Sequence, residues 1–570
     1  MATRVPAAAA GRLWLVRGRG SLSRAADVIE TAPVPRVLAG LVVVEWLAVL
    51  GTARVVRHAG WIYYQGGDQL WYYTLGWLLG HGQLTQTPVG YGWSAMLAPI
   101  ARIAGPNLAS ALPAIVLLNV LVLLPVAVLA LYGIAARIGG RLFGYWAVVL
   151  WIVVPFVGIW YTDSGYHQKY TELLLPQAFG LTAMADFPAM VATLVSIYFC
   201  VRVLWARQPL ILDGVAAGVA AGAAIAIKPA TALFLAGPAL AFAYRRRFVL
   251  AGAMLAGLAP AVIALAVWKE RGLGQLPVLA HGAQHLAGHG LAAAAPLAAL
   301  DFAKYYHQLN WSHLGNNIDL LREHFWSGRL IVWLVIAGLI GLARRSGTAF
   351  VLVGGWFLTF AFVKGSYSAA SVEDGSVFRV MMPSYPAFLL LLASVPLLLP
   401  HAPEKLRPFV AAFTPLRSRT RWSLAGAAVL VSAVVPLAAF AAADTHGGLD
   451  PATIQATIMP VPANIDLGLA ASVHGRRVTL TWRHAKPAGG PVFYRIWRAR
   501  SDGFSCPPSA GARLCKLVLP ELGTTKTGRY VDSAPSGHWV YRVAIAANWL
   551  DDPLYGDPYL VSRPVSVTVP

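Results

Sequence analysis

Acidic residues and charged residues in general are scarce in this chain. Only 12% of its 570 residues are charged, and 24 Asp and Glu residues stand against 45 Lys and Arg. Hydrophobic residues make up 57% of the chain, and the mean hydropathy is +0.60. Soluble globular domains carry about twice this share of charge. The composition therefore excludes an ordinary soluble domain and indicates a polytopic membrane protein.

Nucleotide-binding motifs are also missing. The chain contains no Gly-x-x-x-x-Gly-Lys-Ser/Thr loop and no Gly-x-Gly-x-x-Gly after an expected strand. ATP-driven transport and a Rossmann nucleotide-sugar domain therefore have no support. The net charge of +21 comes from basic residues that cluster in short loops between apolar runs, as in cytoplasmic loops of membrane proteins. No soluble segment carries a basic stripe with interleaved aromatics, so we expect no nucleic-acid partner.

Eleven apolar runs predict about eleven transmembrane helices of roughly 20 residues each. These runs are residues 37–57, 108–133, 142–160, 185–204, 210–226, 230–244, 248–268, 330–343, 348–364, 380–400 and 423–443. Residues 68–80 and 91–104 are expected to form interfacial helices, because Trp and Tyr side chains such as Trp71, Trp77 and Trp93 suit the lipid headgroup level.

The distribution of basic residues predicts the orientation. Residues 1–36 are rich in arginine and are expected to be cytoplasmic, with an uncleaved first span. Basic residues then recur in every second loop, at Arg137, Arg141, Arg202, Arg207, Arg245, Arg246, Arg247, Arg344, Arg345, Lys405, Arg407, Arg417, Arg419 and Arg421. An odd number of spans places the C-terminus outside. The Ala- and Arg-rich composition favours the inner (plasma) membrane of a bacterium.

The composition changes near residue 444. Short alternating runs with turn residues between them predict strands at 478–482, 493–498, 538–543 and 565–569, which is typical of an all-β sandwich. Their order and their aromatic residues resemble a fibronectin type III domain. We therefore expect three parts: a cytoplasmic segment at 1–36, a transmembrane domain at 37–443, and an outer β-sandwich at 444–570.

Two carboxylates lie at membrane boundaries on the expected outer side. Asp68 follows the first apolar run, and Asp186 begins a later one. Acids at such positions cost free energy and are candidate functional groups by default. The alternative for each is a helix N-cap, since Asp is a good capping residue.

Four local patterns around these acids carry a family resemblance. They are Gly67-Asp68-Gln69 with Tyr72-Tyr73, then Ala185-Asp186-Phe187-Pro188-Ala189, Ile227-Lys228-Pro229-Ala230, and Phe378-Arg379-Val380-Met381-Met382-Pro383-Ser384-Tyr385-Pro386-Ala387. In this order, the patterns resemble the GT-C class of membrane glycosyltransferases, in the branch of protein mannosyltransferases and lipid A aminoarabinose transferases. Family members commonly carry Asp-Glu where this chain has Asp68-Gln69.

The resemblance implies a role for each charged residue. Asp68 would be the catalytic base that deprotonates the acceptor. Asp186, the second catalytic candidate, would orient the acceptor, hold the sugar or balance Arg379. Arg379 and Lys228 would bind the phosphate of the donor, although basic residues at a membrane interface are also common without such a role.

Further residues are weaker candidates for lining the substrate site. They are Tyr72, Tyr73, Asp163, His307 and Trp311. Loop acids such as Asp163 are usually only solvated, and the aromatic residues could instead belong to an interfacial helix. His281, His285 and His289 have a spacing that could bind a divalent metal on one helical face. Glycines between them disfavour a helix, so no metal or other cofactor is assigned.

The resemblance implies an inverting glycosyltransferase that uses a polyprenyl-phosphate sugar donor. Its acceptor would be a cell-envelope glycan, a glycolipid or a protein on the outer face, and membrane lipids would surround it. A transporter or flippase of a lipid-linked sugar is the alternative, and a non-catalytic carrier-binding protein is a third. A transporter would place ionisable groups near mid-span.

Cysteine is rare, with three residues in the chain. Cys200 lies in an apolar run and is expected to be a small buried hydrophobe. Cys506 and Cys515 lie in the polar C-terminal region, without the spacing of a zinc or redox Cys-x-x-Cys motif.

We predict that Cys506 and Cys515 form a disulfide, because the expected outer compartment is oxidising. Closing so short a loop contributes roughly 2–3 kcal/mol of stability, less any strain. Alkylation of the unreduced, membrane-inserted protein followed by mass spectrometry checks the bond. Two freely alkylated thiols would contradict it, and labelling only from the cytoplasmic side would overturn the orientation.

Overall fold

The computed structural model describes residues 31–55, 67–85, 87, 89–105, 108–160, 180–273, 310–324, 328–367, 370–372, 376–400, 418–445, 466–484, 493–500, 521–546 and 562–570. Asp163, His307, the histidines at 281, 285 and 289, Cys506 and Cys515 lie outside these residues. The predictions made for them are therefore not tested by the structure.

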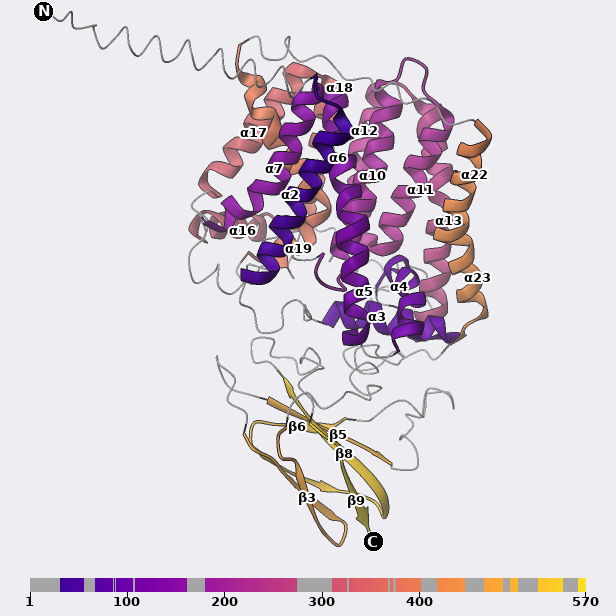
Figure 1. The fold of residues 1–570 in the computed structure, drawn as a ribbon, viewed down its shortest axis with the longest axis vertical. Helices are drawn as coiled ribbons and strands as arrows, with labels where there is room; N and C mark the ends of the chain where they lie inside the picture. The colour runs from indigo at the N-terminus through magenta and orange to yellow at the C-terminus, as the bar shows by residue number, and fades with distance from the viewer. Residues whose placement is uncertain are drawn as a thin grey trace, which may run out of the picture.

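Most of the described chain forms one helical bundle (Figure 1). Its helices are α2 (Val34–Val55), α5 (Leu108–Leu117), η1 (Leu118–Leu123), α6 (Leu124–Gly139), α7 (Arg141–Trp160), α10 (Asp186–Trp205), α11 (Ile211–Ile227), η2 (Pro229–Leu235), α12 (Ala236–Tyr244), α13 (Phe248–Leu273), α17 (Gly328–Arg345), α18 (Gly347–Gly365), α19 (Ser376–Met381), η4 (Met382–Ser384), α20 (Tyr385–Ser394), η5 (Val395–Leu398), α22 (Ser418–Val429), η6 (Leu430–Val434) and α23 (Val435–Ala442).

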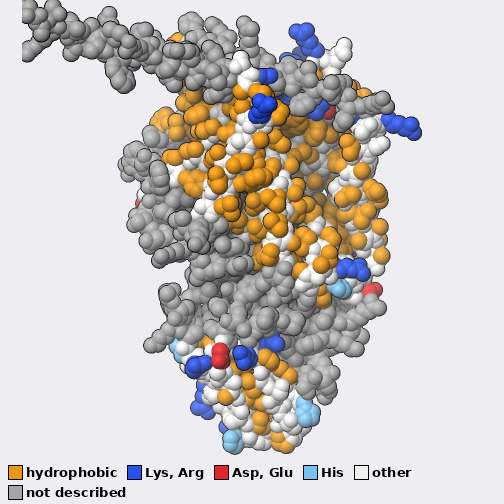
Figure 2. Space-filling view, viewed as in Figure 1, with side chains coloured by type: hydrophobic (Ala, Val, Ile, Leu, Met, Phe, Trp, Pro, Cys, Tyr) orange, Lys and Arg blue, Asp and Glu red, His pale blue; other side chains and the backbone are white. Residues whose placement is uncertain are grey.

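Among the described residues, seven helices are long and apolar enough to cross a membrane. Three more apolar helices, at Arg141–Val157, Ile211–Ile227 and Pro229–Tyr244, are shorter. Helices overlap all eleven of the predicted runs, and hydrophobic side chains cover the side of the bundle seen in Figure 2. The chain is thus a multi-pass helical protein, while the number of eleven spans stays a prediction.

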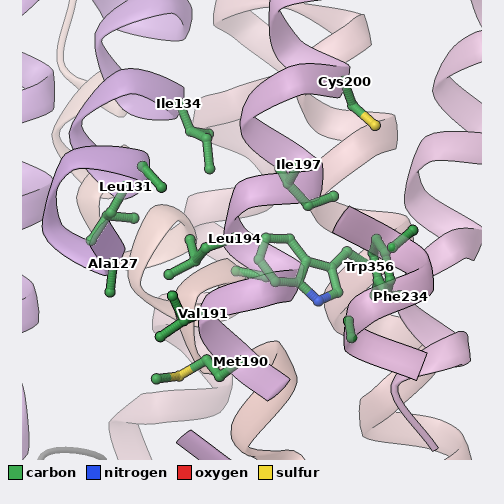
Figure 3. Packing of buried hydrophobic residues seen from close by; sticks show 14 of the residues in the cluster. Ala127, Leu131, Ile134, Met190, Val191, Leu194, Ile197, Cys200, Phe234 and Trp356 are labelled. Atoms are coloured by element: carbon green, nitrogen blue, oxygen red, sulfur yellow. The ribbon is translucent and has the colours of Figure 1, made fainter. Parts of the chain in front are cut away.

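The centre of the bundle is α10, which packs against α6 and α11. In the apolar part of α10, 72% of the residues are buried inside the protein. In the peripheral helical segment Arg419–Ala442 the share is 17%. Figure 3 shows the α10 core residues Met190, Val191, Leu194 and Ile197 beside Ala127, Leu131 and Ile134 of α6. Because α10 is packed against other helices along its length, the positions of both of its ends are fixed. The first residue of α10, Asp186, is therefore held in a defined position.

Basic side chains gather at one end of the bundle. Arg202, in the last turn of α10, pairs with Asp213 at 3.2 Å. Arg345 at the end of α17 donates from Nε to the carbonyl of Ile138 at 3.0 Å. Since α10 has 20 residues, its first residue lies roughly 30 Å from this end. The two ends therefore match the two faces of a bilayer, and which face is cytoplasmic stays a prediction.

Two short helices cover the opposite end, α3 (Gly67–Gly80) and α4 (Tyr91–Ala104). The predicted helices at 68–80 and 91–104 are confirmed. Most of their aromatic side chains are not at the surface, however, since Tyr72, Tyr73, Trp77 and Trp93 are buried in one hydrophobic cluster, while Trp71 is half-buried. The sequence-based reason for their presence is wrong: these rings pack the two helices against α5 and α11 instead of facing lipid headgroups.

The C-terminal region forms two antiparallel sheets. One has the order β3 (Ala470–His474), β4 (Arg477–Thr481), β7 (Arg529–Ser533), and the other has the order β6 (Glu521–Thr525), β5 (Phe493–Arg500), β8 (Gly537–Ala546), β9 (Val565–Val569). The four predicted strands are confirmed. Leu480 and Trp482 beside one sheet share a buried cluster with Tyr494 and Tyr541 of the other, so the sheets pack face to face. The fibronectin type III resemblance stays a prediction.

A short parallel strand pair joins the segment after α3 to the segment after α23, the last helix of the bundle. Gln83 and Leu84 of β1 (Gln83–Leu84) pair with Asp444 and Thr445 of β2 (Asp444–Thr445). The chain therefore leaves the last bundle helix beside α3 and α4, and Figure 1 shows the two sheets beyond the same end.

Close packing of α11 on α13 gives a stability prediction. A Cβ atom at Gly218 would lie 1.9 Å from the carbonyl oxygen of Met254, whereas a Cβ at Gly252 of α13 would meet nothing within 4 Å. We expect Gly218→Ala to cost about 1–3 kcal/mol, the usual range for overpacking, and to lower the unfolding temperature in detergent. Gly252→Ala is the matched control and should leave it unchanged or slightly higher. Equal unfolding temperatures for the two variants would contradict this packing.

Candidate functional site

Asp68, Arg379, Asp186 and Lys228 form one chain of ion pairs at the α3–α4 end of the bundle, called here the ionic cluster. Arg379 pairs with Asp68 through Nη2 and contacts Oδ2 of Asp186 through Nε at 3.4 Å. Lys228 pairs with the other oxygen of Asp186. The structure thus brings together the four charged residues that the sequence singled out, from α3, α10, α19 and the junction of α11 with η2.

Exposure differs across the ionic cluster. The side chain of Asp186 is 1% exposed, and that of Lys228 is 16% exposed. Arg379 and Asp68 are 26% and 32% exposed. Asp186 is therefore enclosed between two cations, whereas Asp68 has the more open carboxylate. A molecule arriving from the aqueous side would reach Asp68 before Asp186.

Three side chains hold the segment that precedes Asp186. The backbone N–H of Ala183 donates to Oε1 of Gln69 at 3.3 Å, and Nε1 of Trp93 donates to the carbonyl of the same residue at 2.7 Å. Nδ2 of Asn119 donates to the carbonyl of Thr182 at 3.1 Å. Because Gln69 follows Asp68 directly, it ties the helix of one acid to the segment leading to the other.

The capping alternative for Asp186 does not fit the structure. The N-cap of α10 is Ala185, with no side-chain cap hydrogen bond, and Asp186 is the first helical residue. Both of its carboxylate oxygens are engaged by Lys228 and Arg379 instead. Asp68 lies in the first turn of α3, where a negative charge is also favoured by the helix dipole.

Lys228 lies at a break between two helices. Its backbone is extended, with φ −139° and ψ 101°, and Pro229 begins the next helix. Close approach of α4 supports this break, since a Cβ atom at Gly90 would lie 2.2 Å from the carbonyl of Ala226. The Tyr72 hydroxyl donates to the carbonyl of Ile227 at 3.4 Å. The tip of this helical hairpin is thus packed in place and presents Lys228 to Asp186.

Arg379 lies in α19, a short helix that continues through η4 into α20. Nε1 of Trp356 donates to the carbonyl of Pro383 at 3.1 Å and holds that junction. The segment before α19 is bound by Asn317 of α16 (Trp311–His324), whose Nδ2 donates to the carbonyls of Gly365 and Ala370 at 3.0 and 3.1 Å. These contacts place the start of α19 beside Asp186.

The remaining substrate-lining candidates have other contacts. Tyr72 is buried, and its pKa is raised by burial and, to a lesser extent, by the charge of Asp186, so its hydroxyl stays protonated near the cluster. Tyr73 is fully buried and donates to the carbonyl of Gly105 at 2.6 Å, which gives it a packing role. Trp311 is 63% exposed, and the centres of its ring and the Phe362 ring lie 5.9 Å apart in a T-shaped arrangement.

The structure also reveals three polar groups that sequence reasoning missed. Gln69 is one. Lys364, near the end of α18, is buried. Glu45 is fully buried in the middle of α2 and accepts a hydrogen bond from Nε1 of Trp151 at 2.9 Å. For Glu45 and Lys364 a signal existed, since each is an ionisable residue inside an apolar run.

No metal centre is found in the described part of the chain, where no group of three or more His, Cys, Asp or Glu side chains could hold an ion. The histidines at 281, 285 and 289 lie outside that part.

No protein-family model and no curated protein matches the chain. Two solved structures show a weak likeness, both of an oligosaccharyltransferase from Archaeoglobus fulgidus. One is tethered with an acceptor peptide containing the NVT sequon, at 15% identity and a TM-score of 0.38. The other is in complex with an inhibitory peptide and a dolichol-phosphate, at 14% identity and a TM-score of 0.36. The matches cover 74% of this chain but only 57% of those chains. Such scores establish neither a common fold nor a common function.

The exposure gradient gives a prediction about stability. Asp186→Asn removes the charge that lies between Lys228 and Arg379 in a site with little water, and we expect it to cost about 3 kcal/mol, as for one partner of a buried pair. Asp68→Asn breaks only the more exposed ion pair and should cost about 0–1 kcal/mol. Thermal unfolding of both purified variants in detergent checks this order. Equal losses, or a larger loss for Asp68→Asn, would show that Asp186 is not the central group.

Proposed function

We propose that this protein is a membrane-embedded glycosyltransferase that moves a sugar from a polyprenyl-phosphate donor to an acceptor on the outer face of the membrane. The observation that supports this most is the ionic cluster itself. Sugar transfer from a lipid phosphate requires a base, cations for the phosphate and a position at the membrane boundary. The ionic cluster supplies all three at the end of the bundle opposite the arginine-rich end.

The differences in exposure suggest how the roles are divided. Asp68 serves as the general base, because its carboxylate is the more open one and pairs with Arg379 at the edge of the cluster. Asp186 serves as a positioning residue that holds Arg379 and Lys228 side by side. Of the three roles that the family resemblance leaves open for Asp186, balancing Arg379 agrees best with its burial. Arg379 and Lys228 bind the donor phosphate.

The transfer then proceeds as one displacement. Asp68 accepts the proton of the acceptor hydroxyl as the acceptor oxygen attacks the anomeric carbon from the face opposite the phosphate. The bond between that carbon and the phosphate oxygen breaks, and its electron pair stays on the phosphate. Polyprenyl phosphate is the leaving group and faces Arg379 and Lys228. The configuration at the anomeric carbon of the sugar is inverted. Asp68 afterwards returns the proton to water.

The acceptor side of the proposal rests on the course of the chain. Because β2 pairs with β1, the C-terminal region starts at the same end of the bundle as the ionic cluster. A glycan, glycolipid or protein acceptor held by the two sheets would therefore lie near Asp68. In this proposal the protein lies in a bacterial plasma membrane, as its composition favours, with this end outside, as the basic loops predict.

Transport of a lipid-linked sugar is the second candidate, and Glu45 favours it. A carboxylate buried at mid-span, as in α2, is typical of transporters and proton relays. The two functions differ in one respect that can be measured: a transferase forms product in detergent solution, where a transporter has no gradient or second compartment.

The proposal is tested by measuring the rate of sugar transfer by the Asp68→Asn variant. Mass spectrometry of surface glycans and lipid-linked sugars, with and without the gene, first identifies the donor. Transfer is then measured in detergent, where we expect the variant to be slower by a factor of at least about 100, the scale for a lost general base. Asp319→Asn is the control, because this acid is 74% exposed on α16 and pairs with Arg322 on the same helix. Near-normal transfer by Asp68→Asn would remove it from catalysis, and no transfer by the wild type would favour transport.

A further inference from the structure

We propose that Trp268 of α13 is a positioning residue of the donor phosphate site and that it sets the place of Lys228 through the segment that begins α4. This inference rests on the proposed function, in which Lys228 binds the phosphate of the donor. α13 carries no member of the ionic cluster, and Trp268 acts on the site through the residues that it holds.

Three hydrogen bonds join the end of α13 to the segment before α4. Nε1 of Trp268 donates to the carbonyl of Val89 at 3.0 Å. The Thr87 hydroxyl donates to the carbonyl of Trp268 at 3.1 Å, and Nζ of Lys269 donates to the carbonyl of Thr87 at 2.6 Å. The segment is therefore held at Thr87 and at Val89, which directly precedes Gly90, the N-cap of α4.

The side chain of Trp268 is itself enclosed by protein. It is fully buried, and its ring centre lies 6.4 Å from that of Tyr91 in α4 and 4.8 Å from that of Phe440 in α23. The Tyr91 hydroxyl donates to the carbonyl of Ser432 at 2.8 Å, so the start of α4 is also bound to the last helical segment of the bundle. With its ring packed against these two aromatic residues, Trp268 keeps its N–H directed at the carbonyl of Val89.

The start of α4 packs directly on the backbone before Lys228. A Cβ atom at Gly90 would lie 2.6 Å from the carbonyl oxygen of Ile227, and a Cβ atom at Gly92 would lie 2.7 Å from the Ile227 nitrogen. The two backbones are thus in close contact, and a shift of one displaces the other. Because Gly90 directly follows the residue that Trp268 holds, the indole hydrogen bond fixes one side of the contact that supports Lys228.

The position of Lys228 matters for a bound phosphate. Its extended backbone lies between two helices, so its location depends on the contacts around this break. Lys228 and Arg379 engage different oxygens of Asp186, and in the proposed function they bind one phosphate group together. Charge-assisted hydrogen bonds require short distances, and a small misplacement of one group has a large effect. Loss of the Trp268 N–H should therefore lower the affinity for the phosphate and leave binding of the polyprenyl chain unchanged.

The experiment measures binding of a short-chain polyprenyl monophosphate, and of the matching polyprenyl alcohol, to the full-length protein in detergent. Trp268→Phe removes the N–H group and keeps an aromatic ring. We expect this variant to bind the monophosphate about 3- to 10-fold more weakly, the effect of one lost hydrogen bond, with alcohol binding unchanged. Trp539→Phe is the matched control, because this buried indole in β8 also donates to a backbone carbonyl, that of Pro535 at 2.7 Å. It should bind both probes like the wild type.

A double variant distinguishes a positioning role from a general loss of stability. If Trp268 acts through Lys228, the effects of Trp268→Phe and Lys228→Met are coupled and not additive. Trp268→Phe should then cause no further loss of monophosphate binding in the Lys228→Met background, where Arg379 still provides a cation for the phosphate. A further loss of 3- to 10-fold in that background would contradict the positioning role.

The outcomes separate this inference from the proposed function. Equal binding of the two probes by the wild type would overturn the donor class and the role of Trp268 together. A phosphate preference that Lys228→Met leaves unchanged would remove Lys228 from the phosphate site, and the role of Trp268 with it. A preference that Lys228→Met reduces and Trp268→Phe leaves intact would overturn only the role of Trp268, as would an equal loss in Trp539→Phe or a parallel loss of alcohol binding. If Trp268→Phe does not fold, Thr87→Val removes the other hydrogen bond of Trp268 with this segment and is assessed in the same way.

Discussion

The site depends on one buried carboxylate at the boundary of an apolar bundle. Asp186 is 1% exposed, and a charge so poorly hydrated is stable only with partners. Lys228 and Arg379 are those partners, one from the break between α11 and η2 and the other from the short helix α19, so Asp186 links three parts of the chain that are distant in sequence. The enclosed helix α10 gives this carboxylate its fixed position. The more exposed Asp68 reaches the same cluster through Arg379, and in the proposed function it is the group that meets the acceptor.

Packing around the cluster explains why its members are so well placed. Small residues allow backbones to approach just before Lys228, as at Gly90 against Ala226 and Gly92 against Ile227. Side-chain amides then fix the connecting segments, with Gln69 on the segment before Asp186 and Asn317 on the segment before α19. The contact of Gln69 also offers a reason for this residue, at a position where the family that the chain resembles commonly has Glu. An amide can accept from the Ala183 N–H without adding a third negative charge beside Asp68 and Asp186.

Local sequence patterns identified some residues of the site and missed others. Asp68, Asp186, Lys228 and Arg379 were found because charged residues beside apolar runs are rare and costly, so each of them is conspicuous in a sequence of this composition. Lys364 and Glu45 carry the same signal but lie inside runs that otherwise read as ordinary spans. The burial of Tyr73 could not be predicted, since an aromatic residue of a short helix suits a headgroup layer and a protein core equally well. Only its hydrogen bond to Gly105 and its complete burial decide between them.

The sequence by itself determined the helical membrane class, the positions of the apolar helices, the four strands and the candidate charges, because hydrophobic length and alternation are local properties. Tertiary structure decided which charges meet. Ion pairing between Arg379 and the two acids requires α3, α10 and α19 to end at the same place, and no local pattern encodes that distance. Tertiary structure likewise decided that Asp186 is enclosed and Asp68 open, since exposure depends on neighbours contributed by the whole bundle. The proposed division of the two carboxylates between holding the cations and meeting the acceptor therefore rests on the fold and not on a local pattern.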